Sequence, residues 1–538
     1  MTASINASKH DDAIASYVVT AAQMQQIEAR LFDSGMPVAA LMEKVAGRLT
    51  QWFTGLHDVG SGRVGVLAGP GHNGGDALVM ARELHHLGYE VCIYQPFANC
   101  KALTAHHARY AKHLGIPFTD SAGDLASCSA VIDGWFGFGL TRPITDTLAE
   151  DVAQINRYGA TVFSIDLPSG IHTDTGQMLG TAIRADYTAC LGLWKRAFMQ
   201  DTALAYLGKC ELVAFDIPVA DIRAVLEAHA VARRITKEEA IAHLPLNRSL
   251  TAHKYTAGHL LLIAGSRQYA GAALLSGLGA VASGVGMLTI AVPESIRLAL
   301  LPQLPGTLLV GCPETEEGSI AQLPDAVKLD RYDAIALGPG LTATVPPLLE
   351  QVLTAECSLL LDADGLNLLA QGDPKSQLKR RNAPTVLTPH VGEFKRLFPK
   401  IYALQSAKTL PGDLALQAAE QCGAIVLLKG ARSAIAAPAS TQQPAQLWFN
   451  PTSTPALARG GSGDVLTGLM GGLLATAAQS TNSEPADEPI ARYLPAVVSS
   501  VWWHSQAAIY AAERRTLLGV DPTQLAHSLN PALVTCQN

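Results

Sequence analysis

The residues whose types and spacing most clearly suit catalysis are 458–468, which read ARGGSGDVLTG. Glycines and a serine come directly before Asp464, and the small apolar residues that follow are compatible with a helix. The N–H groups of such a loop and the positive end of a helix dipole can bind a phosphate or a developing anion. Asp464 can accept a proton from a substrate hydroxyl beside that anion. This combination suits phosphoryl transfer to an alcohol, and the simpler alternative is a turn in which Asp464 caps the helix.

A second glycine-rich loop lies nearer the N-terminus. Residues 69–76 read GPGHNGGD, with a predicted strand before them and a predicted helix, residues 76–87, after them. The loop contains G-x-G-x-x-G, which is typical of dinucleotide dehydrogenases. In those enzymes an acidic residue at the end of the second strand binds the ribose hydroxyls, but here that strand ends in Tyr94-Gln95. We therefore predict a phosphate-binding loop without the usual ribose contact.

Two aspartates, Asp133 and Asp166, each end a predicted buried strand and precede a loop. Ligands of open parallel sheets bind beyond the carboxyl ends of the strands, so either aspartate is placed for proton transfer. Asn73, Asp133 and Ser169 offer oxygen ligands from three different loops, and together they are candidates for binding a hard cation. Taken one at a time, these residues are also common in ordinary turns.

The pattern of strands and helices along the chain predicts an α/β protein with two domains. The first block runs to about Pro218 and includes a helical segment at residues 21–53, and the second starts near Ile235. Strands that alternate with helices favour right-handed crossovers and parallel sheets. Residues 221–240 are predicted to form a charged helical linker. The predicted strands are residues 63–68, 90–94, 130–133, 161–166, 259–264, 287–292, 334–337, 358–362, 385–388 and 424–429.

Composition narrows the class of protein. The chain has 538 residues, 48% hydrophobic and 16% charged, which fits a soluble α/β protein. The net charge of −7, without a cluster of Lys or Arg, gives no sign of a nucleic-acid surface. The nine cysteines form no C-x-x-C pair, and the first 17 residues lack the apolar core of a signal peptide. We therefore expect a cytoplasmic protein with no nucleic-acid partner.

One uncharged segment, residues 271–292, is long enough to span a bilayer. It is rich in Gly, Ala and Ser and ends in a strand-like run, residues 287–292. A buried helix followed by a core strand explains these features better than a membrane span, so we expect no membrane partner.

Residues 20–220 resemble the NAD(P)H-hydrate epimerases, a family with a Rossmann-like doubly wound sheet. The shared patterns are GPGxNGGD, D-x-x-F-G-x-G-L-x-R and S-I-D-x-P-S-G, with departures at His72, Ala77 and Phe138. The resemblance implies that Asp133 or Asp166 is catalytic, and that a potassium ion is bound by Asn73, Asp133 and Ser169. The implied substrate-binding residues are His72, Asn73, Gly74, Gly75, Asp76, Gly137, Phe138, Gly139, Leu140, Thr141, Arg142, Pro143 and Asp166.

Residues 250–475 resemble the ADP/ATP-dependent NAD(P)H-hydrate dehydratases, which have a ribokinase-like fold. The matching segments are, in order, HKYTAGH, AGS, YAGAA, LGPGL, LDADGLN, TPHVGEF, LKGAR and the GSGD loop, with departures at Ala264 and Ser433. The resemblance implies that Asp464 is the base, that the N–H groups of residues 461–463 stabilise the phosphoryl group, and that Glu393 holds a magnesium-bound water. Ala272, Gly340, His390 and Asp464 are implied to bind the substrate. Lys429, Gly430, Ala431, Arg432, Ser433 and Gly463 are implied to bind the adenine nucleotide.

The two resemblances fit one reaction sequence. Hydrated NADH or NADPH (NADHX, NADPHX) carries a hydroxyl at C6, and hydroxide leaves poorly. Phosphorylation makes a better leaving group, which the lone pair of the ring nitrogen then expels. We predict a bifunctional isomerase and carbon–oxygen lyase: an epimerase domain, residues 1–225, supplies the S hydrate, and a dehydratase domain, residues 233–538, dehydrates it with Mg²⁺ and ADP or ATP.

Two alternatives remain open, and one further expectation completes the prediction. The second half could instead be a small-molecule kinase, which would release a stable phosphorylated product. The first half could instead be a binding module without catalysis, although the presence of both Asp133 and Asp166 argues against this. We also expect a homo-oligomer.

Overall fold

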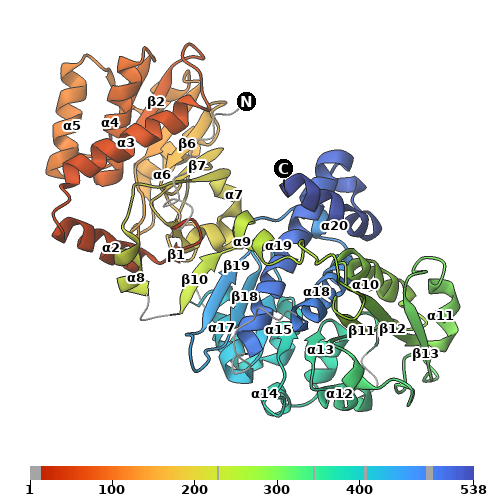
Figure 1. Ribbon diagram of the computed structural model, residues 1–538. Helices are drawn as coiled ribbons and strands as arrows, with labels where there is room; N and C mark the ends of the chain where they lie inside the picture. Colours follow the sequence, from red (N-terminus) through yellow and green to blue (C-terminus); the bar gives the residue numbers. More distant parts are fainter. Residues whose placement is uncertain (1–13, 227–229, 343–345, 405–408, 480–488, 538) are drawn as a thin grey trace. The chain divides into compact units, whose positions relative to one another are not determined.

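The computed structural model describes residues 14–226, 230–342, 346–404, 409–479 and 489–537, and these form two compact units, Met1–His229 and Ala230–Asn538. Each unit is built around a mainly parallel β-sheet with helices packed on it (Figure 1). The predicted α/β class with two domains is therefore confirmed.

The sheet of the first unit has seven strands in the order β4-β3-β2-β5-β6-β7-β9, and every neighbouring pair is parallel. From β2 the chain adds β3 and β4 on one side and then returns to add β5, β6, β7 and β9 on the other. The strand order thus reverses between β2 and β5, and such a switch point is where open parallel sheets bind ligands. The strands are β2 (Val64–Ala68), β3 (Val91–Tyr94), β4 (Phe118–Thr119), β5 (Ala130–Gly134), β6 (Thr161–Ile165), β7 (Tyr187–Leu191) and β9 (Lys209–Val213), and a small separate pair joins β1 (Val18–Val19) to β8 (Trp194–Lys195).

The helices of the first unit depart from prediction in one place. The helical segment expected at residues 21–53 is two helices, because Gly35 has a left-handed backbone (φ 102°) and Pro37 follows it. The first of them begins with a capping box in which Thr20 and Gln23 exchange hydrogen bonds. The helices are α2 (Ala21–Asp33), α3 (Val38–Thr54), α4 (His72–His86), α5 (Ala102–His113), α6 (Asp146–Ile155), α7 (Leu204–Leu207) and α8 (Val219–Leu226).

The sheet of the second unit has ten strands in the order β10-β19-β18-β17-β16-β15-β14-β11-β12-β13. Its pairs are parallel except β17–β18 and β18–β19, and the order reverses between β11 and β14. The predicted helical linker at residues 221–240 is correct only in part: α8 (Val219–Leu226) and α9 (Lys237–Ala242) overlap it, but it also contains β10, which pairs with β19 at the sheet edge. The strands are β10 (Val231–Arg234), β11 (His259–Ile263), β12 (Met287–Pro293), β13 (Leu308–Cys312), β14 (Ala334–Leu337), β15 (Ser358–Leu361), β16 (Thr385–Leu387), β17 (Ile425–Leu428), β18 (Ala434–Ala437) and β19 (Gln446–Phe449).

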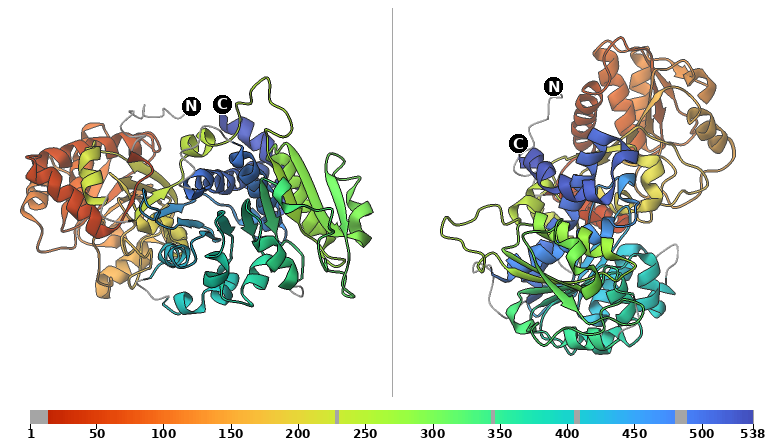
Figure 2. Two further views of the ribbon diagram at one scale, coloured as in Figure 1. Left: turned by 60° about the horizontal axis from the view of Figure 1, so that its bottom comes forward. Right: turned by 90° about the vertical axis from the view of Figure 1, so that its right-hand side faces the viewer.

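Helices cover both faces of this second sheet, with the blue C-terminal helices and the teal helices on opposite sides in the left view of Figure 2. The uncharged segment forms α10 and β12, as predicted, and no helix in the described part of the chain is long and apolar enough to cross a membrane. The helices are α9 (Lys237–Ala242), α10 (Ala270–Ala282), α11 (Glu294–Leu300), α12 (Pro346–Leu353), α13 (Asp364–Leu369), α14 (Pro374–Leu378), α15 (Val391–Leu397), α16 (Pro399–Tyr402), α17 (Pro411–Cys422), α18 (Ser462–Ala478), α19 (Pro489–Arg515) and α20 (Pro522–Gln537).

Helices α10 and α18 approach each other closely because glycines form their contact. A Cβ at Gly279 would lie 2.2 Å from the backbone oxygen of Val465, and a Cβ at Gly468 would lie 1.7 Å from that of Ser276. No side chain fits at either position without moving a helix backbone. The glycine contact therefore fixes the position of α18, and with it the glycine-rich loop at its N-terminus.

Candidate active sites

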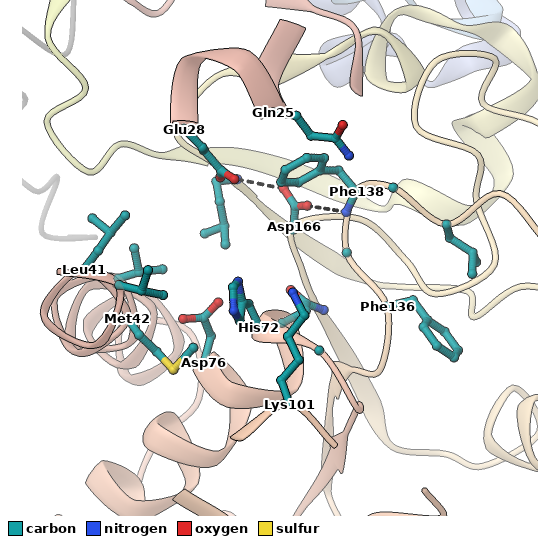
Figure 3. Close-up of a pocket in the computed structure, with 18 of the residues that line it drawn as sticks. Gln25, Glu28, Leu41, Met42, His72, Asp76, Lys101, Phe136, Phe138 and Asp166 are labelled. Atoms are coloured by element: carbon teal, nitrogen blue, oxygen red, sulfur yellow. Dashed lines mark hydrogen bonds between the residues drawn. The ribbon is translucent and has the colours of Figure 1, made fainter. Parts of the chain in front are cut away.

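The first unit contains a cavity of about 510 Å³ at the carboxyl edge of its sheet (Figure 3). Its walls come from α2 and α3, from the loops that follow β2 and β5, and from the ends of β6 and β7. Most of the substrate-binding residues that the sequence predicted line this cavity, whereas Gly74, Gly75, Thr141 and Pro143 do not. The predicted residues that line it are His72, Asn73, Asp76, Gly137, Phe138, Gly139, Leu140, Arg142 and Asp166.

The loop GPGHNGGD needs its glycines for close packing. A Cβ at Gly69 would lie 1.8 Å from the carbonyl oxygen of Trp135, and one at Gly74 would lie 2.0 Å from the carbonyl oxygen of Gly69. The loop leads directly into α4, which begins at His72. Because residues of this first turn line the cavity, the free N–H groups and positive dipole end of α4 favour an anionic ligand part there.

Asp166 lies on the cavity wall and is held by a lysine. Its Oδ1 pairs with the Nζ of Lys195 at 2.5 Å, and its Oδ2 accepts from the N–H of Phe138 at 2.7 Å. Burial alone would lower the pKa of Lys195, but the carboxylate of Asp166 raises it, so the pair is charged. Asp166 also has a left-handed backbone, with φ of 67°, a conformation that side chains other than glycine adopt at a cost and that often marks functional sites.

Asp133 differs from Asp166, because it is fully buried and does not line the cavity. Its carboxylate accepts hydrogen bonds from Ser164 Oγ, from the N–H of Trp135 and from both the N–H and Oγ of Ser169, at 2.6 to 3.3 Å. Burial raises the pKa of Asp133, although these hydrogen bonds oppose the rise. The sequence offered two aspartates for proton transfer. In the structure Asp166 lines the cavity, whereas Asp133 is buried behind it and hydrogen-bonds to Ser164 and Ser169.

The three predicted cation ligands lie around one loop. Ser169 Oγ donates to Asp133 at 2.6 Å and accepts from the N–H of Phe136 at 2.9 Å. Asn73 lies close to that loop, since a Cβ at Gly137 would be 3.0 Å from its Oδ1. The Nδ2 of Asn73 is buried and has no hydrogen-bond partner. The structure therefore brings Asp133 and Ser169 into contact and Asn73 near them.

In the second unit Asp464 is the third residue of α18. The helix begins directly after Gly461, whose left-handed backbone (φ 99°) makes the tight turn. Asp464 is half-buried, and burial raises its pKa to about 7, with the carboxylate of Asp362 adding to the rise and Lys429 opposing it. A carboxyl with a pKa near neutrality is well suited to exchange protons with a substrate hydroxyl.

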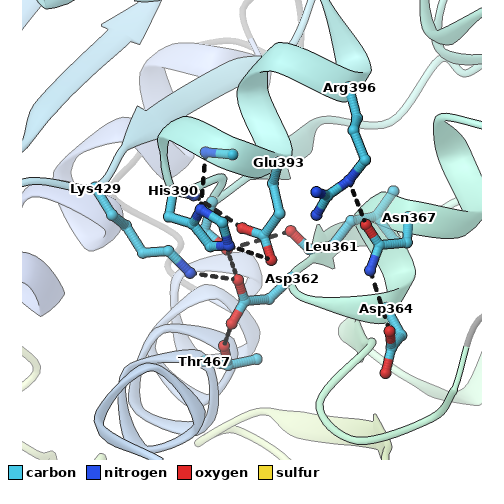
Figure 4. A network of polar contacts seen from close by, with 11 residues as sticks. Leu361, Asp362, Asp364, Asn367, His390, Glu393, Arg396, Lys429 and Thr467 are labelled. Carbon is cyan, nitrogen blue, oxygen red and sulfur yellow. Dashed lines mark hydrogen bonds and ion pairs between the residues drawn. The ribbon is translucent and has the colours of Figure 1, made fainter. Parts of the chain in front are cut away.

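A partly buried ion pair joins Lys429 and Asp362 (Figure 4). Lys429 Nζ is 2.7 Å from Asp362 Oδ1, and the hydroxyls of Thr388 and Thr467 donate to the same carboxylate at 2.8 and 2.6 Å. Gly463 covers the pair, because a Cβ there would be 3.8 Å from the Nζ of Lys429. Burial would raise the pKa of Asp362, but Lys429 and the hydrogen bonds lower it below its usual value. The pair is therefore charged, with its ammonium beneath the anion loop.

His390 and Glu393 form the N-terminal cap of α15. The Nδ1 of His390 accepts from the N–H of Gly392 at 2.9 Å, and Glu393 Oε2 accepts from the N–H of His390 at 2.8 Å. Glu393 is buried, whereas the His390 side chain is 56% exposed. His390 also lies next to Lys429, whose N–H donates to the carbonyl of Pro389 at 2.9 Å. The structure thus uses one oxygen of Glu393, the residue expected to hold a magnesium-bound water, in the cap.

The remaining predicted residues of this site fall into two groups. Gly340, with φ of 66°, faces the start of α10, and a Cβ on it would lie 2.8 Å from that of Ala272. Residues 429–433 form a turn after β17 in which Ser433 Oγ donates to the carbonyl of Gly430 at 3.0 Å. The turn contains Gly430, Ala431 and Arg432, and Gly463 lies within reach of its first residue, Lys429.

Comparison with known proteins agrees with this geometry. Residues 38–197 match the family described as YjeF-related protein N-terminus, and residues 260–531 match the family described as NAD(P)H-hydrate dehydratase. The bifunctional NAD(P)H-hydrate repair enzyme Nnr of Synechocystis sp. is 51% identical over 96% of this chain and 94% of its own length. The enzyme of the same name from Thermosynechococcus vestitus is 48% identical over 96% of this chain and 97% of its own length. The chain belongs to the bifunctional NAD(P)H-hydrate repair enzyme family.

A solved structure is also similar to part of this chain. The ADP/ATP-dependent NAD(P)H-hydrate dehydratase from Bacillus subtilis, co-crystallised with ATP and Mg²⁺, is 33% identical and covers 56% of this chain and 97% of its own, with a TM-score of 0.45. The family resemblance predicted from the motifs is confirmed by the relatives that span nearly the whole chain.

Three residues of this family member were not singled out as site residues by the sequence: Lys195, Asp362 and His504. Lys195 lies in an apolar run, LGLWKRAF, where a buried charge is unusual and could have signalled a site. Asp362 was part of a matched motif but had no role assigned. His504 of α19 is buried, and its Nε2 lies 2.9 Å from the carbonyl oxygen of Ser462, the first residue of α18. Burial lowers the pKa of His504 to about 4, so the ring is neutral and donates its Nε2–H to that carbonyl.

Proposed function

We propose that the two units carry out successive steps in the repair of hydrated NADH and NADPH. The first unit interconverts the R and S epimers at C6, and the second dehydrates the S hydrate in a reaction that consumes ADP or ATP. The observation that carries this proposal is Asp464, a half-buried carboxyl with a pKa of about 7 that follows an anion-binding loop directly. The family membership supports both activities.

For the first unit, the substrate's C6 carries both the hydroxyl and the ring nitrogen N1. Removal of the hydroxyl proton breaks the C6–N1 bond and leaves an aldehyde, and ring closure on the other face inverts the centre. Asp166 is the base, because it is the charged carboxylate on the cavity wall. Residues 72–76 and 137–143 bind the substrate, with its phosphates near the N-terminus of α4. Asp133 holds the loop above it through Ser169.

A potassium ion fits the donors offered by Asn73, Asp133 and Ser169. In the described residues no Lys, Arg or His makes an ion pair with the buried carboxylate of Asp133. A monovalent cation would offset the one negative charge, and oxygen ligands suit a hard ion. Asn73, Asp133 and Ser169 would hold the ion, and its positive charge would offset the negative charge of the Asp133 carboxylate. No cluster of three His, Cys, Asp or Glu in the described residues favours a divalent metal.

For the second unit, Asp464 removes the proton from the C6 hydroxyl, and the N–H groups of residues 461–463 stabilise the transferred phosphoryl group. The nucleotide lies along the turn at residues 429–433, and the hydrated ring lies against Ala272, Gly340 and His390. Mg²⁺ bound with the nucleotide would neutralise phosphate charge, and Glu393, the buried carboxyl of α15, would hold a water bound to it. The Lys429 ammonium adds a fixed positive charge below the loop.

The test is a single assay. The chain is incubated with hydrated NADH, Mg²⁺ and ADP or ATP, and the reduced-nicotinamide absorbance is followed. We expect absorbance to return, with inorganic phosphate released in equal amount. A stable phosphorylated product without recovery of NADH would overturn dehydration and favour the small-molecule kinase alternative.

A further inference from the structure

Glu28 is a carboxyl in the cavity of the first unit that neither the motifs nor the mechanism above uses. It lies on α2, next to the buried stripe formed by Met24, Ile27 and Leu31, where an apolar residue would be expected. Its side chain lines the cavity and points from α2 toward Asp166 (Figure 3). A carboxyl on the buried side of a helix carries a desolvation penalty, which is unusual unless the group has a partner or a task.

No protein group in the described residues donates a hydrogen bond to the Glu28 carboxyl or forms an ion pair with it. Burial raises the pKa of Glu28 to about 7, and this rise is opposed by Lys195 and Lys101 and reinforced by Asp166. The carboxyl is therefore protonated in a large fraction of molecules near neutral pH and is free to donate to a ligand. The charged and titratable groups that share the cavity with it are His72, Asp76, Lys101, Arg142, Asp166 and Lys195.

The charge states of these carboxyls differ. Asp166 forms an ion pair with the Lys195 ammonium at 2.5 Å and accepts from the N–H of Phe138 at 2.7 Å. Asp76 is buried, and burial raises its pKa well above the usual value. Glu28 has a pKa of about 7. A group that titrates close to the working pH exchanges protons most effectively. The cavity thus holds one proton acceptor, Asp166, and one readily exchanged proton, on Glu28.

We propose that Glu28 is the second catalytic residue of the epimerase site, which protonates N1 of the substrate as Asp166 accepts the proton of the C6 hydroxyl. The O–H electron pair becomes the second bond of the aldehyde C=O, and the C6–N1 pair stays on nitrogen with the proton from Glu28. Rotation about C5–C6 and the reverse transfers close the ring on the other face and return both protons. No oxidant, nucleotide or other reactant is consumed. This inference rests on the proposed epimerase function and adds the acid that ring opening requires.

The experiment measures epimer interconversion by the full chain, in potassium and without nucleotide, from pH 5.5 to 8.5 (a range of about 1.5 units around the Glu28 pKa). Spontaneous epimerisation is subtracted at each pH. For the wild type, kcat/KM is expected to fall as pH rises through about 7, because the proton donor is lost. Glu28→Gln is expected to lower the rate about 10²- to 10⁴-fold and to remove this limb of the profile. Glu28→Asp keeps a titrating carboxyl and is expected to retain the limb at a lower rate.

Asp33→Asn is the matched control, because Asp33 is exposed on the same helix and does not line the cavity. It is expected to behave as the wild type. A Glu28→Gln variant with wild-type rates, or with lower rates and an unchanged limb, would overturn the role of Glu28 and leave the proposed function standing. So would a wild-type profile without a limb near pH 7, which requires no variant to fold. A wild-type chain that does not interconvert the epimers would instead overturn the proposed function itself.

Discussion

The two sites of this chain share one electrostatic arrangement and build it from different parts of the fold. Each has a buried aspartate paired with a lysine beyond the end of a central strand: Asp166 with Lys195 at 2.5 Å, and Asp362 with Lys429 at 2.7 Å. Each pair is nearly neutral as a unit and so can remain buried. The Asp362 carboxylate also accepts from two hydroxyls, whereas Asp166 accepts from the N–H of Phe138 and lines the cavity.

Each site also has a second carboxyl whose pKa lies near 7, Glu28 in the first unit and Asp464 in the second. Asp464 belongs to the anion loop itself and therefore acts where phosphate is bound. Glu28 comes from α2, a helix before the first strand of the main sheet, and it lies outside the anion loop, although both line the same cavity. The difference teaches that an ion pair next to a carboxyl that titrates near neutral pH suits proton transfer in general, and that phosphoryl transfer is expected where this carboxyl directly follows the anion loop.

The largest effect is expected for Asp464→Asn. Removal of the base should lower dehydration about 10²- to 10⁴-fold, while nucleotide binding stays close to that of the wild type. Dehydration of the S hydrate is measured by absorbance and nucleotide binding by calorimetry. The epimerase rate of the same preparation is the control and should not change. Near-normal dehydration by this variant would refute the proposed base.

The ion pairs should matter most when only one partner is lost. Lys429→Met leaves the Asp362 carboxylate buried and unpaired, which is expected to cost about 3–5 kcal/mol of unfolding free energy. The double variant Asp362→Asn with Lys429→Met removes both charges and should recover a large part of that loss. Urea denaturation of the single and double variants measures both values. Equal destabilisation by the single and double variants would show that the charges do not depend on each other.

His504 makes the stability of the second unit depend on pH. Its folded-state pKa is about 4 against an ordinary value of 6.5, so the unfolded chain takes up a proton first as pH falls. The stabilisation is fully present above pH 6.5 and is lost between 6.5 and 4, by about 3 kcal/mol in total. His504→Gln keeps an N–H donor without titrating, and its unfolding free energy should fall less over this range. Parallel pH slopes for the two proteins would contradict this.

The smallest effect is expected at the cation site. Asp133→Ala should lower epimerisation about tenfold or more and also abolish its response when potassium replaces a large organic cation. Dehydration of the S hydrate should be unchanged, because that site lies in the other unit. Equal epimerase rates of the wild type in the two salts would remove the cation from the mechanism.

The sequence predicted the local features of the fold better than the contacts within the sites. The central strands of both sheets are continuous apolar runs, which is why they could be located within one or two residues. Strand β10 reads VARR and was missed, because a short charged edge strand shows no apolar pattern. Asp166 and Lys195 are 29 residues apart, and Asp362 and Lys429 are 67 apart. Such pairs form through the sheet topology, and no spacing rule in the sequence reveals them.

The glycine contact between α10 and α18 has a consequence for how the second unit tolerates mutation. Gly468 lies one turn after Asp464 and never meets the substrate, yet a single methyl group there would collide with the backbone of Ser276. The helix would have to shift, and the carboxyl of Asp464 would shift with it. A displacement of about 1 Å can cost about 10²-fold in rate. A screen for lost activity would therefore report Gly468 among the essential positions, although its contribution is the spacing between two helices.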